Sequence, residues 1–354
     1  MNEIDKIENV IFNGYTDVEL EMLCKKREIK IPTLFWTTEL YGFGKCYREW
    51  LGLSKLLPIP FYGDHGVTLS NNLFNHEIDN KSCYHLTWNK YRYENPKNHI
   101  LKKLIYITNP WITYRKKKKF TLKKDRKGTI VFLSHSIIGI DLEDENNDKY
   151  FNELNKLDND LKPLVICIHM HDINKGLHKK LRKYELPLIT IGNSLNSDFV
   201  DRFYDIISNF KHATSNSIGS QLFYCTEIGL PYFLYGDRPD YFNKSDENMP
   251  KGKMTYYDNN TEILSKEIIM SFSKFSQSIT EKQQNLTISL LGLDAMDNKE
   301  RIISLYKYEL FKFFPYYLKL IFFSLNSKIK SKKILLRKIL KKIGMYSMII
   351  FQSY

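Results

Sequence analysis

A turn rich in hydroxyl and amide side chains, from Thr214 to Ser220, comes where a predicted strand ends and a helix begins. Asn216 or Ser217 could cap that helix. A helix N-terminus offers unpaired N–H groups and the positive end of the dipole, which together favour an anion. Glu227 follows ten residues after Ser217, where its carboxylate could bind a ribose hydroxyl. The candidate phosphate ligands are Thr214, Ser215, Asn216, Ser217 and Ser220. An ordinary capped helix is the alternative interpretation.

Polar residues also follow three other predicted strands. In an open parallel sheet, ligands bind beyond the carboxyl ends of the strands, so these residues should line one crevice. They are His135 and Ser136, then His169 and Lys175, and finally Gly192. Such a group suits a nucleoside mono- or diphosphate with an attached sugar. A helix cap or a satisfied loop residue is the ordinary alternative for each. His169 and His171 should point to opposite faces of their strand end, so no metal site is expected.

The elements that would position these residues alternate regularly after Thr129. Short apolar runs and helical segments alternate as in a parallel sheet with crossover helices. The predicted strands are 129–134, 163–169, 187–192, 212–216 and 231–236. The predicted helices are 148–160, 175–184, 197–210 and 217–229, with a further helix at about 260–277.

The first third of the chain predicts a second α/β domain. Its expected strands are 31–36, 58–66 and 103–111, with a helix at 45–57. The sequence therefore predicts an α/β fold with two Rossmann-like domains that face a cleft. The predicted segments are an acceptor-side domain at 1–125, a donor domain at 128–300 and basic amphipathic helices at 301–354. Residues 115–127 would be a linker with its charges in solvent or near lipid.

Composition limits the class of protein. The 354 residues are 43% hydrophobic, which is enough for buried cores, and the five cysteines lack metal-binding spacing. No leader-like segment opens the chain, so a cytoplasmic location is expected. The net charge of +13 is concentrated in 115–127 and in 310–354. A nucleic-acid partner is not expected, because this charge lies in a linker and a tail rather than on the folded body.

The basic tail predicts an element that lies on a membrane surface. Five apolar residues would share an arc of about 100° on a helix, with lysines on the remainder. They are Ile329, Leu336, Ile339, Leu340 and Ile343. The preceding apolar stretch is interrupted by Lys312 and Lys319 and is shorter than the roughly 20 residues that span a bilayer. The expected partner of residues 310–354 is the anionic inner leaflet, with the protein peripheral on the inner face of the plasma membrane. A helix that packs back on the body is the alternative.

Four segments of the second domain resemble a group of bacterial GT-B-type glycosyltransferases of surface polysaccharide synthesis. They are 132–141, 165–176, 187–208 and 214–233. The resemblance implies the GT-B architecture and transfer of a sugar from a nucleotide-sugar donor, the co-substrate. The acceptor would be a growing or lipid-linked surface glycan of a capsule, O-antigen or lipooligosaccharide. It also implies that Glu227 holds the ribose.

This resemblance implies a mechanism without a tightly bound cofactor or metal, because the helix N-terminus would stabilise the leaving phosphate. If the reaction inverts the anomeric carbon, a base from the first domain must deprotonate the acceptor. His65 and Asp64 are the first candidates and Glu39 the reserve. Hexosyl and sialyl transfer are equally compatible. Alternatives are a non-catalytic membrane-surface or nucleic-acid binding protein, and a related transferase of a CDP-linked phospho-alcohol.

Overall fold

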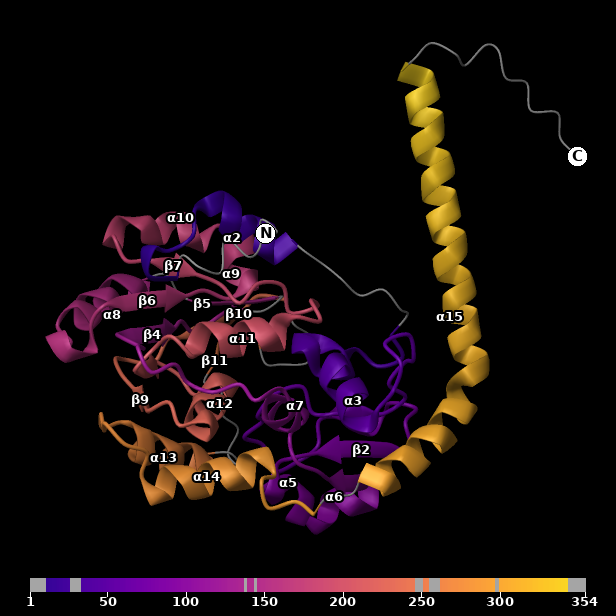
Figure 1. The fold of residues 1–354 in the computed structure, drawn as a ribbon, viewed down its shortest axis with the longest axis horizontal. Helices are drawn as coiled ribbons and strands as arrows, with labels where there is room; N and C mark the ends of the chain where they lie inside the picture. The colour runs from indigo at the N-terminus through magenta and orange to yellow at the C-terminus, as the bar shows by residue number, and fades with distance from the viewer. Residues whose placement is uncertain are drawn as a thin grey trace, which may run out of the picture.

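The computed structural model describes residues 11–25, 33–136, 139–142, 145–245, 251–254, 262–296 and 299–342, with side chains to Phe322 in the last helix. It confirms an α/β fold that contains two parallel sheets (Figure 1). The larger sheet has the strand order β7-β6-β4-β8-β9, and all four pairings are parallel.

The five strands of the larger sheet are the five that the sequence predicts after Thr129. They are β4 (Thr129–Phe132), β6 (Leu164–Cys167), β7 (Leu188–Ile189), β8 (His212–Ser215) and β9 (Tyr232–Leu234). Ile130 of the central strand pairs with Val165 on one side and Ala213 on the other, and all three are fully buried. Helices on both faces cause this burial, which is why the strands read as continuous apolar runs. The connecting helices are α8 (Glu145–Asn155), α9 (Met170–Asn174), α10 (Leu177–Leu181), α11 (Phe199–Ile207) and α12 (Ser220–Ile228).

The smaller sheet consists of β1 (Tyr62–Gly63), β2 (Tyr84–Thr87) and β3 (Lys103–Tyr106) in that order, all parallel. Only two residues of the predicted strand 58–66 are extended and paired, because Pro58 and Pro60 lack the N–H that a ladder needs. The associated helices are α3 (Phe43–Leu51), α4 (Asn75–Ile78), α5 (Lys90–Glu94), α6 (Pro96–Leu101) and α7 (Pro110–Lys118).

The predicted strand 31–36 is wrong where the structure describes it. Residues 33–35 form no strand, and Trp36 begins the 3-10 turn η2 (Trp36–Thr38). Residues 31–32 lie outside the described part of the chain. Strand β2 was not predicted from the sequence. Its residues His85 and Thr87 are fully buried although they are polar, so the segment lacks an apolar run. A small antiparallel sheet was missed as well: β5 (Ile140–Leu142), β10 (Tyr241–Asn243) and β11 (Gly252–Met254).

Several segments connect the two sheets. Helix α2 (Asp17–Lys25) comes early in the chain, yet it packs beside the larger sheet, where Asn193 Nδ2 donates to Cys24 O at 2.6 Å. The Trp111 ring of α7 stacks on Tyr224 of α12 with centroids 4.6 Å apart. Helices α13 (Glu262–Phe272) and α14 (Glu281–Leu291) follow the larger sheet, and α14 contacts both α12 and α5. The proposed segments 1–125, 128–300 and 301–354 stay a prediction.

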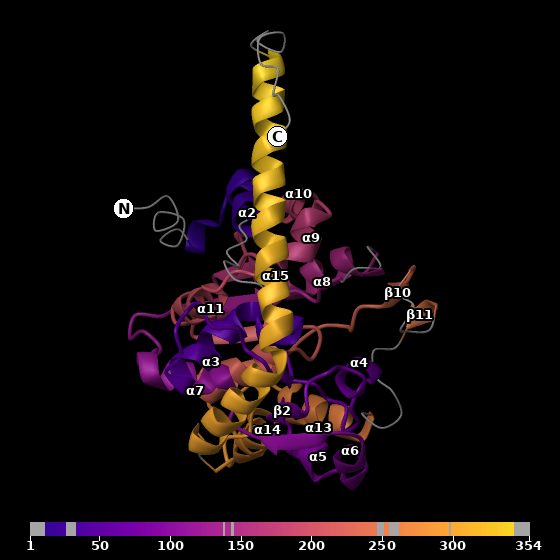
Figure 2. The ribbon, with the colours of Figure 1, turned by 90° about the vertical axis from the view of Figure 1, so that its right-hand side faces the viewer.

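Helix α15 (Lys299–Lys342) begins against the smaller sheet, and its second half runs past the body (Figures 1 and 2). One face is buried: Tyr306 OH donates to Pro58 O at 3.2 Å, and Phe313 packs on Phe35 with centroids 5.4 Å apart. The opposite face carries five large exposed residues within an arc of about 120°. This exposed stripe comprises Tyr308, Phe311, Phe314, Leu318 and Phe322. None of the helices in the described residues is long and apolar enough to cross a bilayer. The side chains of the predicted stripe from Ile329 to Ile343 lie outside the described part.

Candidate functional site

Some polar side chains of the turn after β8 form hydrogen bonds to the backbone of the turn and of the neighbouring strand. Thr214 is fully buried in the strand, and its hydroxyl donates to Phe233 O at 2.7 Å. The Ser215 hydroxyl, also fully buried, donates to Ser217 O. These two hydroxyls therefore stabilise the turn, and the prediction that they bind phosphate directly has no support in their placement.

Asn216 and Ser217 face a residue that the sequence analysis did not select. Ser134 Oγ lies 2.8 Å from Asn216 Oδ1 and 2.6 Å from Ser217 Oγ, so the ends of β4 and β8 meet in one polar cluster. The signal for Ser134 is its place directly before His135, at the end of a central strand. Helix α12 begins at Ser220 with Gly219 at the N-cap, so neither Asn216 nor Ser217 caps it. Gly219 makes no side-chain capping bond, which leaves the first turn of α12 to satisfy its N–H groups by other partners.

Three histidines gather at the ends of β4 and β6. The His135 and His169 rings stack with centroids 4.1 Å apart, and His171 lies 4.9 Å from His169. His169 caps α9 by accepting from His171 N at 3.3 Å, while its Nε2 is buried and has no partner among the described residues. Burial and the two neighbouring imidazoles hold the pKa of His169 well below its usual value. Burial also lowers the pKa of His171.

Ser136 is committed to a buried carboxylate. Its hydroxyl and its backbone N–H both donate to Asp172 Oδ1, at 2.5 and 3.1 Å. Burial raises the pKa of Asp172 above its usual value. Ser136 therefore stabilises the loop after β4, and its predicted contact to a ligand would require these bonds to break.

Lys175 and Gly192 have local structural roles. Lys175 forms an ion pair with Asp141 of β5 at the surface. Gly192 has a φ of +95°, and a Cβ there would lie 2.9 Å from Arg202 Nη1. The turn after β7 therefore requires glycine for its backbone conformation and for space.

Glu227 lies at the far end of α12 from the strand-end turn. Its Oε1 accepts from Arg115 Nη2 of α7 at 2.6 Å, and its side chain is only 5% exposed. Arg115 is thus an exception to the expectation that the charges of 115–127 lie in solvent, whereas the lysines from Lys116 to Lys119 are exposed as expected. Arg115 occupies only Oε1, and Oε2 is buried without a hydrogen-bond partner among the described residues, so the assignment of Glu227 to the ribose stays a prediction.

The loop after β1 reaches across to the start of α12. Val67 N donates to Ser220 Oγ at 2.8 Å, and a Cβ on Gly66 would lie 2.8 Å from the same oxygen. The structure thus brings the loop that carries His65 to the turn that carries Ser217. His65 packs on Trp36 with ring centroids 4.9 Å apart, and burial lowers its pKa to about 4. The imidazole is therefore neutral at physiological pH, and the same burial makes it a weaker base than an exposed histidine.

Asp64 belongs to a buried ionic network instead of an open site. Its Oδ1 lies 2.6 Å from Arg92 Nη1 and 2.9 Å from His85 Nε2, and its Oδ2 accepts from Thr87 at 2.7 Å. Burial alone would raise the pKa of this carboxyl, but Arg92, His85 and Thr87 outweigh that effect and hold the pKa below its usual value. The same guanidinium contacts Glu77 at 2.9 Å. Asp64 is thus occupied and shielded, and its role as a catalytic base stays a prediction that would require these contacts to rearrange.

The carboxylates of this network also have to be considered as metal ligands. Ligand atoms of Asp64, Glu77 and His85 lie within 4.8 Å of one another. Arg92 already supplies a positive charge between the two carboxylates. The guanidinium of Arg92 therefore supplies the positive charge that a metal ion would otherwise supply at this position.

Glu39, the reserve base, forms a bidentate pair with Arg48 of α3. Arg48 Nη1 lies 3.1 Å from Glu39 Oε2, Nη2 contacts Oε1, and both side chains are about nine-tenths buried. The geometry explains its place in the loop and leaves neither oxygen without a partner, and its role as a reserve base stays a prediction. Of the three candidate bases, only His65 has an imidazole or carboxylate without a hydrogen-bond partner among the described residues.

Tyr41 provides a second contact between the two halves. It adopts a φ of +52°, its N–H donates to Ser194 O at 2.5 Å, and its ring lies 6.4 Å from His169. Positive φ is uncommon outside glycine and indicates that the surrounding contacts impose it. The loops of the N-terminal half therefore cover the strand ends of the larger sheet at two places, Tyr41 and Val67.

Comparison with known proteins adds a partial likeness of fold. No family model matches this chain, and no curated protein matches it at a significant level. Among solved structures, the chain is similar to the wall teichoic acid polymerase TagF. One TagF variant has 15% sequence identity and a TM-score of 0.40, with 73% of this chain and 69% of that chain covered. A TagF structure soaked with CDPG has 16% identity and a TM-score of 0.35, and the chain spans 67% of its own length and only 58% of the TagF chain. The pneumococcal O-GlcNAc transferase GtfA, in complex with UDP and GlcNAc, has 10% identity and a TM-score of 0.28, with 70% and 47% covered. At these scores the likeness extends to part of the fold and no further.

Proposed function

We propose that this protein is a glycosyltransferase that binds a nucleotide-sugar at the strand ends of the larger sheet. The observation that carries the proposal is the hydrogen bond from Val67 N to Ser220 Oγ. It joins the loop with the neutral His65 to the N-terminus of α12, which has no side-chain cap, beside the cluster of Ser134, Asn216 and Ser217. A group that can accept a proton and a group that can hold phosphate are then adjacent, as transfer from an activated donor requires.

In this proposal, the leaving phosphate lies at the first turn of α12. The N–H groups and dipole of the helix, the hydroxyls of Ser134 and Ser217, and the imidazole of His135 stabilise its charge. His65 accepts the proton of the acceptor hydroxyl as that oxygen attacks the anomeric carbon, and the nucleotide leaves with inversion. These groups suffice without a metal. The acceptor would be a growing or lipid-linked surface glycan of the capsule, O-antigen or lipooligosaccharide kind.

A thermal-shift screen over UDP-, GDP-, CMP- and CDP-linked compounds tests the donor site. A ligand at 100 times its Kd stabilises the native state by about 2.7 kcal/mol and raises the Tm. We expect this rise for a nucleotide-sugar and expect Ser217→Ala to reduce it. Ser273→Ala is the matched control, because Ser273 is exposed and directly follows α13, outside the candidate donor site. A response only to CDP-linked phospho-alcohols would reassign the donor, and no response to any compound would contradict the site.

We also propose that the protein docks on the anionic inner face of the plasma membrane through α15. The supporting observation is that this helix has two apolar faces. Phe313 and Tyr317 are buried against the body, whereas Phe311 on the opposite face is 83% exposed. The lysines that follow, from Lys328 to Lys342, would attract an anionic surface while the exposed stripe enters the headgroup layer.

A further inference from the structure

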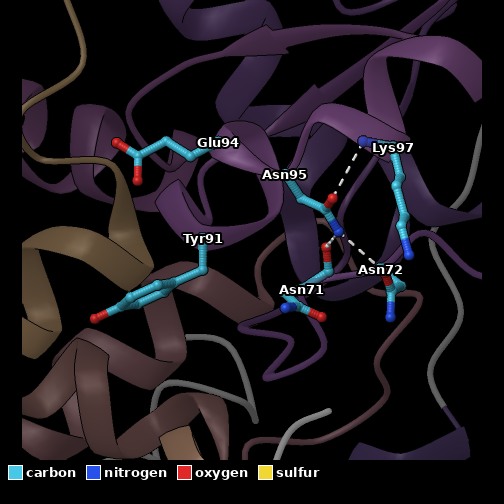
Figure 3. Close-up of a pocket in the computed structure, with 6 residues that line it drawn as sticks. All are labelled: Asn71, Asn72, Tyr91, Glu94, Asn95 and Lys97. Carbon is cyan, nitrogen blue, oxygen red and sulfur yellow. Dashed lines mark hydrogen bonds between the residues drawn. The ribbon is translucent and has the colours of Figure 1, made fainter.

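An open hollow of about 430 Å³ lies on the N-terminal half, at the start of α5 and α6 (Figure 3). Its volume is within the range of small-ligand pockets, roughly 300 to 1,000 Å³. Figure 3 shows Tyr91 and Glu94 on one side, Asn72 and Lys97 on the other, and Asn95 and Asn71 between them. These six residues line it, and none belongs to the candidate donor site.

One of the three amides holds the hollow in shape. Asn95 Nδ2 donates to Asn71 O and to Asn72 Oδ1, both at 3.0 Å, and Asn95 Oδ1 caps α6 by accepting from Lys97 N at 3.2 Å. Asn98 Nδ2 also donates to Asn71 O, at 2.8 Å. The backbone of 71–72 and the start of α6 are thus fixed to each other before any ligand arrives.

The other polar groups of the hollow are unused. Asn71 Oδ1 is buried without a hydrogen-bond partner, a situation that costs free energy and needs an explanation. Among the described residues, nothing accepts from Asn72 Nδ2, and the Glu94 carboxylate and the Lys97 ammonium have no ion-pair partner. The hollow therefore offers the Glu94 carboxylate as an acceptor and the Asn72 and Lys97 nitrogens as donors, with the buried Asn71 Oδ1 beneath them.

This chemistry matches a carbohydrate. Each sugar hydroxyl both donates and accepts, so it pairs with mixed amide, carboxylate and ammonium groups. Tyr91 adds an aromatic side chain, 37% exposed, that can cover the apolar face of a sugar ring. One acid and one base balance each other, which disfavours a phosphate, and the many polar groups disfavour an apolar ligand.

A single buried residue links the hollow to the candidate base. Arg92 Nη2 donates to Asn72 O at 2.9 Å, and Arg92 Nη1 lies 2.6 Å from Asp64, the neighbour of His65. Arg92 is fully buried. Arg92 therefore fixes the position of the loop that lines the hollow relative to the loop that carries His65.

We infer that this hollow binds a sugar unit of the acceptor glycan, at a distance along the chain from the hydroxyl that reacts at His65. That the bound sugar belongs to an acceptor rests on the proposed function, whereas the binding of a sugar rests on the residues of the hollow alone. The ligand class is an uncharged, polyhydroxylated oligosaccharide.

The test is binding of the full chain to an array of neutral hexose and N-acetylhexosamine oligosaccharides, followed by titration of the ones that bind. Asn72→Asp keeps Oδ1, which Asn95 needs, replaces the free donor with a carboxylate oxygen and adds one negative charge. Glu94→Gln removes the free carboxylate and changes the charge in the opposite direction. We expect each to raise the Kd about tenfold, the value of one hydrogen bond of about 1.4 kcal/mol. Asn152→Asp, the same change at an exposed site on α8, should leave the Kd unchanged.

The outcomes separate this inference from the proposed function. No binding of any oligosaccharide at millimolar concentration would overturn the inference, as would variants that bind within twofold of the wild type. If nucleotides raise the Tm while no oligosaccharide binds, the hollow alone is wrong. If the wild type binds oligosaccharides and both variants lose them, but no nucleotide binds, the hollow is supported and the transferase is contradicted.

Discussion

Asp64 and His65 are neighbours in the chain with opposite environments. Asp64 is fixed by Arg92, His85 and Thr87 inside the protein, whereas the His65 ring rests on Trp36 without a hydrogen bond from the described residues. The network fixes the backbone just before His65 and so limits where its ring can lie. The two residues would act together, one by positioning and one by accepting a proton.

The pH dependence of transfer should follow His65. Because burial lowers its pKa to about 4, the imidazole is already in the neutral, proton-accepting form at pH 6. We expect the chemical rate to be level above about pH 5 and to fall about tenfold per unit below pH 4, as the base becomes protonated. A pH–rate profile with the donor found by thermal shift measures this.

His65→Gln is the matching variant, with an expected rate loss of about 10²- to 10⁴-fold and an unchanged donor-induced Tm shift. His99→Gln is the control, because His99 is exposed and its ring nitrogen contacts Tyr93 O on α5. An inflection that stays near pH 6.5, or a fully active His65→Gln protein, would remove His65 as the base.

At the scale of elements, α12 joins both halves of the molecule by its two ends. Ser220 at its start bonds to the loop after β1, and Glu227 at its end pairs with Arg115 of α7. A helix anchored at both ends to the same half of the chain can hold the strand-end turn in place without contributing Glu227 to the ligand.

The ion pair between Glu227 of α12 and Arg115 of α7 allows a test that separates a structural role of Glu227 from ribose binding. Glu227→Gln and Arg115→Met should each lower the free energy of unfolding by roughly 3 kcal/mol, because each leaves a largely buried charge without its partner. The double variant should lose less than the sum of the two. Urea denaturation measures the losses. A Glu227→Gln protein of normal stability that no longer responds to nucleotides would restore Glu227 to the ribose.

The elements also show what a sequence can reveal. The five strands of the larger sheet are predictable, because burial on both faces produces apolar runs such as Leu164–Cys167. Strand β2 is not predictable from the sequence, since its buried residues His85 and Thr87 are polar. Both form hydrogen bonds to the carboxylate of Asp64, which lies more than 20 residues earlier in the chain. The same reason limits the site. His65 and the Ser217 turn are recognisable from their positions after strands, but the partners that occupy Glu39 and Glu227 are set by the fold.

At the scale of the whole molecule, α15 extends the protein well beyond its two sheets (Figure 2). Its buried face closes the core of the N-terminal half through Tyr306 and Phe313. Its exposed stripe lies on the other side, so the same helix can be part of the fold and of a contact with another surface.

Membrane docking can be tested with vesicles that contain phosphatidylglycerol. We expect the wild type to sediment with them and to be released by salt, since screening weakens the attraction of the lysines. The double variant Phe311→Ser/Phe322→Ser should weaken binding at least tenfold, because burial of one phenylalanine side chain contributes about 1.5 to 3 kcal/mol. Tyr316→Ser, at an exposed aromatic residue outside the stripe, is the control. Equal binding by the double variant, or by a protein that lacks 328–354, would contradict docking through this helix.

The buried face of α15 also sets the order in which the chain can fold during its synthesis. Tyr306 bonds to Pro58, which precedes it by 248 residues, and Glu309 accepts from Cys83 N, 226 residues earlier. The smaller sheet is translated first but lacks these contacts until the start of α15 has left the ribosome. All five strands of the larger sheet lie between Thr129 and Leu234, and they can pair as soon as they emerge. The part of the protein made first is therefore the part completed last, and the newly made N-terminal half is the segment that a chaperone would have to protect.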